Sequence, residues 1–243
     1  MQNKVEEKNV FRNLAVNDSY SEAYDDEYLQ FYKILLGDRY YQSGQKILDI
    51  GCGTGRQSIR LAKLGFNITG IDIASEAIHE AERKAEEESI EVRFIVGDAE
   101  ATMFERDAFD ICFCGGVLHH FNDLDSLSRE LFRITKPRGM VCSFDPNALH
   151  LYSFFSHNVL NKFMKLHSFY QYFSPNERAL KPEELETAFR SAGFTSFRFE
   201  SMMLHTKKKK FKNIRTMGYA CSSLLPGRLR KGNMLLMTCV KER

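Results

Sequence analysis

The sequence predicts an α/β fold in which helices cover both faces of a mostly parallel sheet. Two observations support this fold class. Strand and helix signals alternate from residue 46 to the C-terminus, and the first strand ends in a glycine-rich turn. The chain has 243 residues, of which 43% are hydrophobic and 27% are charged, and these values are typical of one compact globular domain. We therefore expect a single domain over residues 1–243.

The strands are predicted from apolar runs that end in glycine, aspartate or proline signals. Residues 1–45 come first as a helical N-terminal cap, because Leu29, Tyr32 and Leu36 recur at helical spacing. Residues 46–145 then form the core of the fold, and further elements follow up to the C-terminus. The expected strands are Lys46–Ile50, Asn67–Asp72, Val92–Val96, Phe109–Cys114, Met140–Phe144, Phe194–Phe199 and Met234–Val240.

The helices are predicted from amphipathic spacing and from the residues that stop them. A glycine follows the first and the last helix, and Pro137 with Gly139 ends the third. In the second, small and apolar residues share one inner face: Ala77, Ile78, Ala81 and Ala85. The expected helices are Arg56–Leu64, Ser75 to about Glu88, 124–134 and Glu183–Ala192.

Three glycines at alternate positions, Gly51, Gly53 and Gly55, join the first strand to the first helix. Bare backbone lets a ligand approach closely, and the amide groups at a helix N-terminus attract phosphate or carboxylate. We therefore expect a nucleotide-like cofactor. Dinucleotide folds require a small residue at position 56, where this chain has Arg56, which argues against NAD or FAD. A P-loop is excluded because no Gly-Lys-Ser/Thr follows.

Acidic residues end the next two strands. Asp72 ends the second strand, where a carboxylate can accept both hydroxyls of a ribose. Asp98 follows the third strand and can accept from the exocyclic amine of adenine, with the amide of Ala99 beside it. The alternative for each is an ordinary solvated or turn aspartate. The fourth strand runs into Gly115 and Gly116, which again fits backbone that closely approaches a ligand.

Five motifs follow one another along roughly residues 45–145: Asp49-x-Gly51-x-Gly53-x-Gly55, Asp72, Gly97-Asp98-Ala99, Asp110 through His120, and Lys136-Pro137-Arg138-Gly139. As an ordered set they resemble the class I S-adenosylmethionine-dependent methyltransferases. Within that superfamily the chain is similar to the small-molecule type 11 enzymes, which include the ubiquinone-biosynthesis-like methyltransferases. The resemblance implies a Rossmann-like seven-stranded sheet with an antiparallel last strand. It also implies S-adenosyl-L-methionine as cofactor, S-adenosyl-L-homocysteine as product and a small molecule as methyl acceptor.

The resemblance further implies which residues bind the cofactor. Each part of the cofactor is assigned its own residues. They are Gly51, Cys52, Gly53 and Gly55 for the methionine and ribose, Asp72 for the ribose hydroxyls, Ile73, Asp98 and Ala99 for the adenine, Cys114 and Gly115 for the methionine end, and Tyr20 or Tyr24 as a cover over the cofactor.

Methyl transfer from a sulfonium needs little more than alignment of the acceptor, so a general base is required only for a poorly acidic OH or NH group. His120 and His119 are the catalytic candidates, because they lie just beyond the reactive end of the cofactor by analogy. The alternative is that they start a helix or pack. We predict no metal site, because Cys114 stands where metal-dependent catechol-type enzymes have a carboxylate. The Cys114-Gly115-Gly116 sequence also lacks the Asn/Asp-Pro-Pro-aromatic motif of nucleic-acid amino-methylating enzymes.

Two insertions, residues 147–174 and 201–233, are too long for ordinary connections. The first is rich in aromatic side chains and the second contains Lys207–Lys210. We expect them to form a lid over the acceptor pocket, which indicates a hydrophobic or amphipathic acceptor carrying negative charge. Two alternatives stay open. The aromatic residues can simply form core while the lysines form a solvated face, or the basic segment 207–231 contacts RNA or a membrane surface.

We expect the protein to be cytoplasmic. No apolar run approaches the roughly 18 residues that span a bilayer, and residues 1–9 are too polar for a signal peptide. Six cysteines without a zinc-type pattern are expected to be buried free thiols. A net charge of +2 is too small to indicate DNA as a partner. Two functional classes remain at this point: an active methyltransferase, or an inactive S-adenosylmethionine-binding protein that acts as a sensor or partner subunit.

Overall fold

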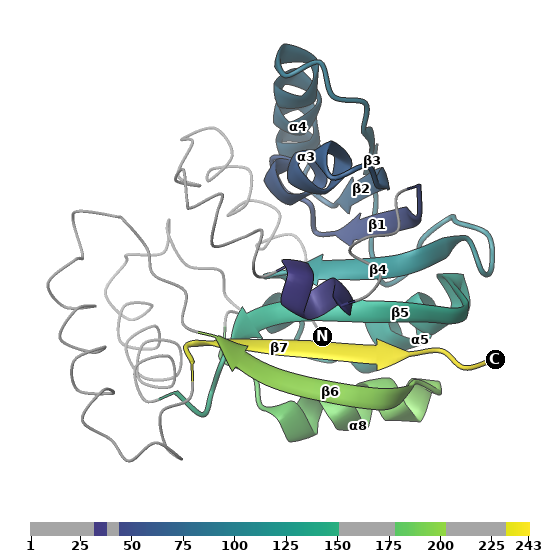
Figure 1. Ribbon diagram of the computed structural model, residues 1–243, viewed down its shortest axis with the longest axis vertical. Coiled ribbons are helices and arrows are strands. Elements are labelled where there is room, and N and C mark those ends of the chain that lie inside the picture. The colour runs from purple at the N-terminus through teal and green to yellow at the C-terminus, as the bar shows by residue number, and fades with distance from the viewer. Residues whose placement is uncertain (1–31, 38–43, 151–177, 203–231) are drawn as a thin grey trace, which may run out of the picture.

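A seven-stranded sheet forms the centre of the molecule (Figure 1). The computed structural model describes residues 32–37, 44–150, 178–202 and 232–243. The strands are β1 (Lys46–Ile50), β2 (Asn67–Asp72), β3 (Arg93–Val96), β4 (Phe109–Gly115), β5 (Thr135–Pro146), β6 (Thr195–Met202) and β7 (Met234–Val240). Their order is β3-β2-β1-β4-β5-β7-β6. β7 runs antiparallel to both of its neighbours, β5 and β6, and the other strand pairs are parallel. The predicted fold class, with its antiparallel last strand, is confirmed.

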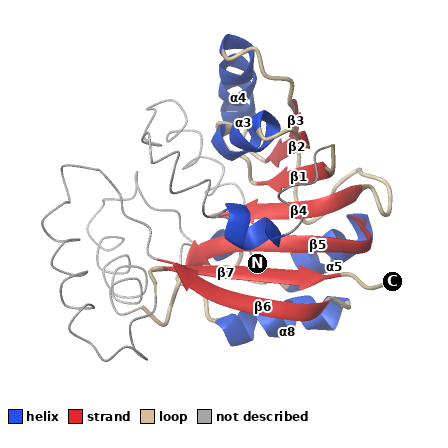
Figure 2. Ribbon diagram, in the orientation of Figure 1, coloured by secondary structure: helices blue, strands red, loops and turns tan. Residues whose placement is uncertain are grey.

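Helices cover both faces of this sheet (Figure 2). They are α3 (Arg56–Lys63), α4 (Ser75–Glu87), α5 (Asp125–Ile134) and α8 (Pro182–Ala192), with a 3-10 turn, η2 (Leu118–His120), and a helical turn over residues 32–37. One apolar cluster packs α5 and α8 against alternate strand residues such as Leu48, Cys112 and Val141. The other packs α3 and residues 32–36 against the intervening positions, such as Ile47 and Phe113. Strand residues alternate between two buried faces, as expected for a sheet covered on both sides.

Most of the predicted boundaries hold to within one or two residues, and the inner face of α4 is confirmed. The start of β5 differs. The preceding helix ends at Ile134 as predicted, but the strand that was expected to begin at Met140 begins at once with Thr135, which pairs with Phe109. The pairing of β4 with β5 shifts register just beyond this point. Pro137 and Gly139, which the sequence pattern assigns to a helix stop, therefore belong to the irregular start of β5.

The connection between β3 and β4, residues 97–108, contains no helix and is an irregular segment. Ala99, Phe104 and Ala108 of this segment pack against the cluster that contains α5 and α8. The ring of Phe104 meets Phe109 edge-on at 4.9 Å between centroids. The segment thus covers the apolar sheet face where a crossover helix would otherwise lie.

The C-terminal end of α5 is closed by Lys241, which follows β7. Its ammonium contacts Asp107 Oδ1 at 2.6 Å and donates to the carbonyls of Phe132 at 2.9 Å and Thr135 at 2.8 Å. The Lys241 side chain is only 4% exposed. Helix carbonyls at a C-terminus have no partner within the helix, so a buried cation here satisfies groups that water cannot reach.

Replacing Lys241 by methionine is expected to lower the free energy of unfolding by about 2–4 kcal/mol, because two carbonyls lose a charged donor in a buried place. Urea unfolding measures this loss. Lys63→Met is the matched control. Lys63 also pairs with a carboxylate, that of Glu88, but the Lys63 side chain is 49% exposed. That exposed pair should contribute about 0–1 kcal/mol. Equal losses in the two variants would contradict the role assigned to Lys241.

Candidate functional site

The residues predicted to bind the cofactor lie at one edge of the sheet, beyond the carboxyl ends of four adjacent strands. β1 lies between β2 and β4, and β3 flanks β2, so the turns that follow these strands come together. In Figure 1 the arrowheads of β1 and β4 point toward this edge. Ligands of open α/β sheets bind at such an edge, and particularly where the strand order reverses, as it does here between β1 and β4.

The glycine loop uses its glycines for different purposes. At Gly53 the backbone has φ +52°, and a Cβ built there would meet nothing within 4 Å, so this backbone borders open space. At Gly55, the residue before α3, φ is +75° and a Cβ would lie 2.8 Å from both Ala81 Cβ and Phe94 Cζ. Gly55 is therefore required by packing, while Gly53 offers bare backbone to a ligand.

Asp72 connects the glycine loop to the end of β2. Its Oδ2 accepts the amide proton of Gly53 at 2.9 Å, and its Oδ1 accepts that of Ala74 at 2.9 Å. Burial raises the pKa of Asp72, and the hydrogen bonds from backbone amides partly offset this effect. A carboxylate has about four lone-pair directions, so Asp72 can accept hydroxyls of a ribose in addition to these backbone amides. The half-buried Ile73 follows directly.

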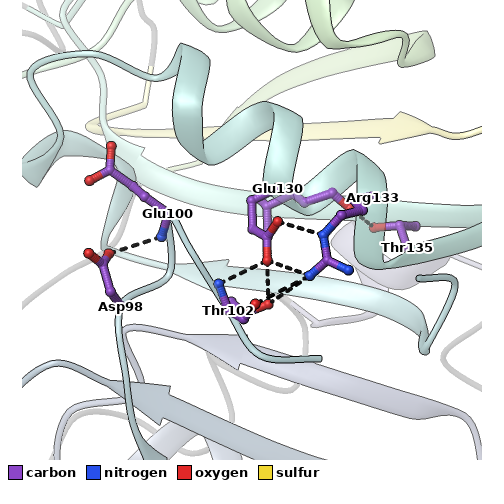
Figure 3. Close-up of polar contacts among 7 residues, drawn as sticks. Asp98, Glu100, Thr102, Glu130, Arg133 and Thr135 are labelled. Carbon is purple, nitrogen blue, oxygen red and sulfur yellow. Dashed lines mark hydrogen bonds and ion pairs between the residues drawn. The ribbon is translucent and has the colours of Figure 1, made fainter. Parts of the chain in front are cut away.

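Asp98 and Ala99 lie at the start of the irregular segment after β3. The amide of Gly97 donates to the carbonyl of Asp72 at 2.9 Å, which holds the two strand ends together. Figure 3 shows Asp98 Oδ1 accepting the amide proton of Glu100, at 3.0 Å. Asp98 is thus set in a turn beside Asp72, as a residue that addresses the adenine of a nucleotide would be.

The last predicted site residues lie at the end of β4 and in the 3-10 turn that follows it. The Cys114 side chain is fully buried in the cluster with α5 and α8, so only its backbone can approach a ligand. Gly115 ends β4, and η2 then carries the two candidate histidines. The rings of His119 and His120 contact each other, with centroids 4.0 Å apart.

His119 is paired with a buried carboxylate. Its Nδ1 lies 2.9 Å from Asp145 Oδ1, and its backbone amide donates to the same oxygen at 3.1 Å. Asp145 belongs to the end of β5 and is completely buried, which raises the pKa of its carboxyl well above the usual range. This pairing was not predicted from the sequence. An acidic residue at the end of an otherwise apolar strand was the available signal.

Asp49, the first residue of the glycine motif, is a second buried carboxyl for which the sequence predicted no role. It accepts a hydrogen bond from Ser58 Oγ at 2.6 Å. Burial, and to a lesser extent the nearby charge of Asp72, raises its pKa to about 7, while the Ser58 hydrogen bond opposes this. The glycine loop thus contains a group that changes charge near neutral pH.

The wild type should lose stability relative to Asp49→Asn as the pH rises from 5 to 8. The unfolded chain releases the Asp49 proton near pH 4, whereas the folded protein keeps it up to about pH 7. The stabilising effect of that proton is therefore lost as the pH rises through 7, by about 2–3 kcal/mol over this interval. Asparagine retains an acceptor for Ser58 and does not titrate. Urea unfolding of both proteins at pH 5 and 8 measures the difference, and parallel pH profiles would contradict it.

Two further predictions cannot be compared with the structure. Tyr20 and Tyr24 lie outside the described residues, as do most of both insertions. Within the described ranges, no three His, Cys, Asp or Glu side chains are grouped so as to hold a metal ion. The prediction of no metal stays a prediction. In the same part of the chain, no helix has the length and apolar character needed to cross a membrane.

Comparison with known proteins defines the class. A family model described as a methyltransferase domain matches residues 41–215. The ubiquinone biosynthesis O-methyltransferase of Pseudomonas fluorescens is 30% identical over 167 residues, which cover 66% of this chain and 68% of that protein. The chain belongs to the methyltransferase-domain family. It is a class I S-adenosylmethionine-dependent methyltransferase, as its motifs predict.

Solved structures agree with the fold. Phosphoethanolamine N-methyltransferase 2 of Haemonchus contortus, in complex with phosphomonomethylethanolamine and S-adenosylhomocysteine, has a TM-score of 0.67 at 20% identity. The alignment covers 95% of this chain and 57% of that one. The [4+2]-cyclase SpnF has a TM-score of 0.61 at 18% identity, over 87% of this chain and 80% of that one. At such identities the likeness concerns the fold alone.

Proposed function

We propose that this methyltransferase acts on a small-molecule acceptor that is hydrophobic or amphipathic and carries negative charge. The observation that carries the proposal is the edge of the sheet where Gly53, Asp72 and the pair His119–Asp145 come together on adjacent strand ends. The relative from Pseudomonas fluorescens bears the name of an enzyme of ubiquinone biosynthesis, and the Haemonchus structure contains a phosphorylated small amine. Both names support a small acceptor.

The residues at this edge fit the cofactor. Gly53 presents open backbone, and Asp72 presents a carboxylate that backbone amides hold in place. S-adenosylmethionine supplies a methyl group that is already activated on a sulfonium. Asp72 would bind the ribose, Asp98 and Ala99 the adenine, and the glycine loop the methionine end. What remains for the chain is to hold the acceptor in line and, where needed, to take its proton.

His119 is suited to take that proton. A carboxylate that accepts from Nδ1 fixes the imidazole tautomer and its orientation, so that the basic lone pair is on Nε2. In its ionised form Asp145 also stabilises the imidazolium that forms when His119 accepts a proton from an acceptor OH or NH group. An acceptor that is already ionised would not need this step.

The direct experiment is incubation with S-adenosylmethionine labelled on the methyl group, together with lipid and metabolite extracts. We expect label in an acidic, organic-soluble small molecule. Label only in RNA or protein would contradict the proposal. The basic segment 207–231 makes RNA a necessary part of the experiment.

The alternative function is that of a cofactor-binding protein that no longer transfers methyl groups. The cyclase SpnF is an example of this fold serving another reaction. Tight cofactor binding without any labelled product would favour it.

A further inference from the structure

We propose that Glu130 and Arg133 of α5 are positioning residues for the adenine of the cofactor. They act through Thr102, which ends the turn that carries Asp98 and Ala99. This inference rests on the proposed assignment of Asp98 to the adenine, and it adds two residues of α5, which belongs to none of the cofactor motifs.

The contact between α5 and the turn is a closed set of hydrogen bonds (Figure 3). Glu130 Oε1 accepts from the backbone amide of Thr102 at 2.9 Å and from its hydroxyl. Arg133 holds the same carboxylate with two bonds, Nε to Oε2 at 2.8 Å and a terminal nitrogen to Oε1 at 2.7 Å. Arg133 also reaches the carbonyl of Thr102 at 3.4 Å. Glu130 thus joins the turn to the helix while Arg133 fixes the Glu130 rotamer.

The electrostatics of the pair keep this contact ionised. Burial alone would raise the pKa of Glu130, but the hydrogen bonds from Arg133 and Thr102 outweigh it and lower that pKa. The same contact raises the pKa of Arg133. The Glu130 side chain is 11% exposed, so the pair is screened less than a surface ion pair. A buried glutamate that meets both a bidentate arginine and a backbone amide is a strong and directional anchor.

On its far side the turn is held by this anchor and by the packing of Phe104 against the cluster that contains α5 and α8. Its near side is tied to β2 by the bond from Gly97 to the Asp72 carbonyl. Beyond Thr102, the side chain of Met103 is 98% exposed and offers no packing. No helix follows β3, so the ladder of helical hydrogen bonds that would order these residues is missing. The position of the Asp98 carboxylate is therefore set from both ends, by Asp72 and by Glu130.

A second ion pair has the geometry of Glu130–Arg133 but does not contact the turn, so it serves as a control. On α4, Arg83 binds Glu80 with the same i,i+3 spacing and the same two bonds, Nε to Oε2 at 2.8 Å and a terminal nitrogen to Oε1 at 2.7 Å. Glu80 accepts no loop amide in the hydrogen bonds found among the described residues. Glu80→Gln therefore removes an equivalent ion pair without touching the turn.

The test compares binding of S-adenosylhomocysteine with binding of its inosine analogue, in which a carbonyl oxygen replaces the exocyclic amine. Calorimetry on the full chain gives the ratio of the two dissociation constants. In the wild type and in Glu80→Gln the adenine compound should bind at least about tenfold more tightly, because the analogue presents a carbonyl oxygen to Asp98 in place of the exocyclic amine. In Glu130→Gln we expect this preference to fall at least about fivefold, as in Asp98→Asn. Thr102→Val, which removes only the hydroxyl, should cause a smaller fall.

Each outcome bears on the inference. A Glu130→Gln protein that keeps the wild-type preference overturns it, and so does an equal loss of preference in Glu80→Gln. Circular dichroism shows whether Glu130→Gln is folded. If that variant unfolds, Thr102→Val provides the same test, and an unchanged preference there overturns the inference. A wild type that binds no S-adenosylhomocysteine contradicts the proposed function instead.

Discussion

Asp72→Ala is expected to weaken the binding of S-adenosylmethionine and S-adenosylhomocysteine by at least about 100-fold. Two charge-assisted hydrogen bonds to the ribose are lost, each worth roughly 1.5–3 kcal/mol. The structure adds a second cause, because Asp72 also holds the amides of Gly53 and Ala74 and so fixes the glycine loop against β2. Calorimetric titration with either compound measures the loss.

A carboxylate at the opposite edge of the same sheet supplies the control. Asp110 accepts the amide of Lys46 at 2.9 Å and pairs with Lys136 at 2.8 Å, at the amino ends of the parallel strands. Asp110→Ala should leave the cofactor dissociation constant within about twofold of the wild type, because it removes similar contacts far from the site. An unchanged affinity in Asp72→Ala would refute the ribose assignment.

His119→Gln is expected to lower kcat by about 10²–10⁴-fold on an acceptor that must lose a proton, with little change in cofactor affinity. Glutamine can still donate to Asp145, so the buried carboxylate is not left without a partner. Asp145→Asn should cause a smaller loss, of roughly 10–100-fold, because the imidazole stays but loses its orienting carboxylate. Initial rates and the dissociation constant of S-adenosylhomocysteine are measured for each protein.

His120→Gln decides between the two neighbouring histidines. The sequence treats them alike, whereas the structure pairs His119 with the buried Asp145. We therefore expect the larger loss of kcat in His119→Gln. A larger loss in His120→Gln would transfer the role of base to that residue. Activity at wild-type level in both variants would mean that alignment of the acceptor alone supports the reaction.

Much of the fold could be predicted from the sequence because its signals are local. The turn at Gly53 requires a backbone that other residues rarely adopt, the inner face of α4 has the helical period, and Asp72 ends its strand. The start of β5 could not be predicted in this way. Pro137 and Gly139 are local signals against a strand, but Thr135 joins the sheet by pairing with Phe109, which is far away in the sequence.

The sequence by itself determined the class of this protein, because the order and spacing of the glycine loop, Asp72 and Asp98 are properties of the chain that need no contacts to be read. The tertiary structure decided how the residues of the site act on one another. Asp145 lies 26 positions from His119, and Glu130 lies 28 positions from Thr102, yet both pairs are in hydrogen-bond contact. Such pairs form only through tertiary packing, since residues 26 or 28 positions apart are too distant along a single helix or strand to touch.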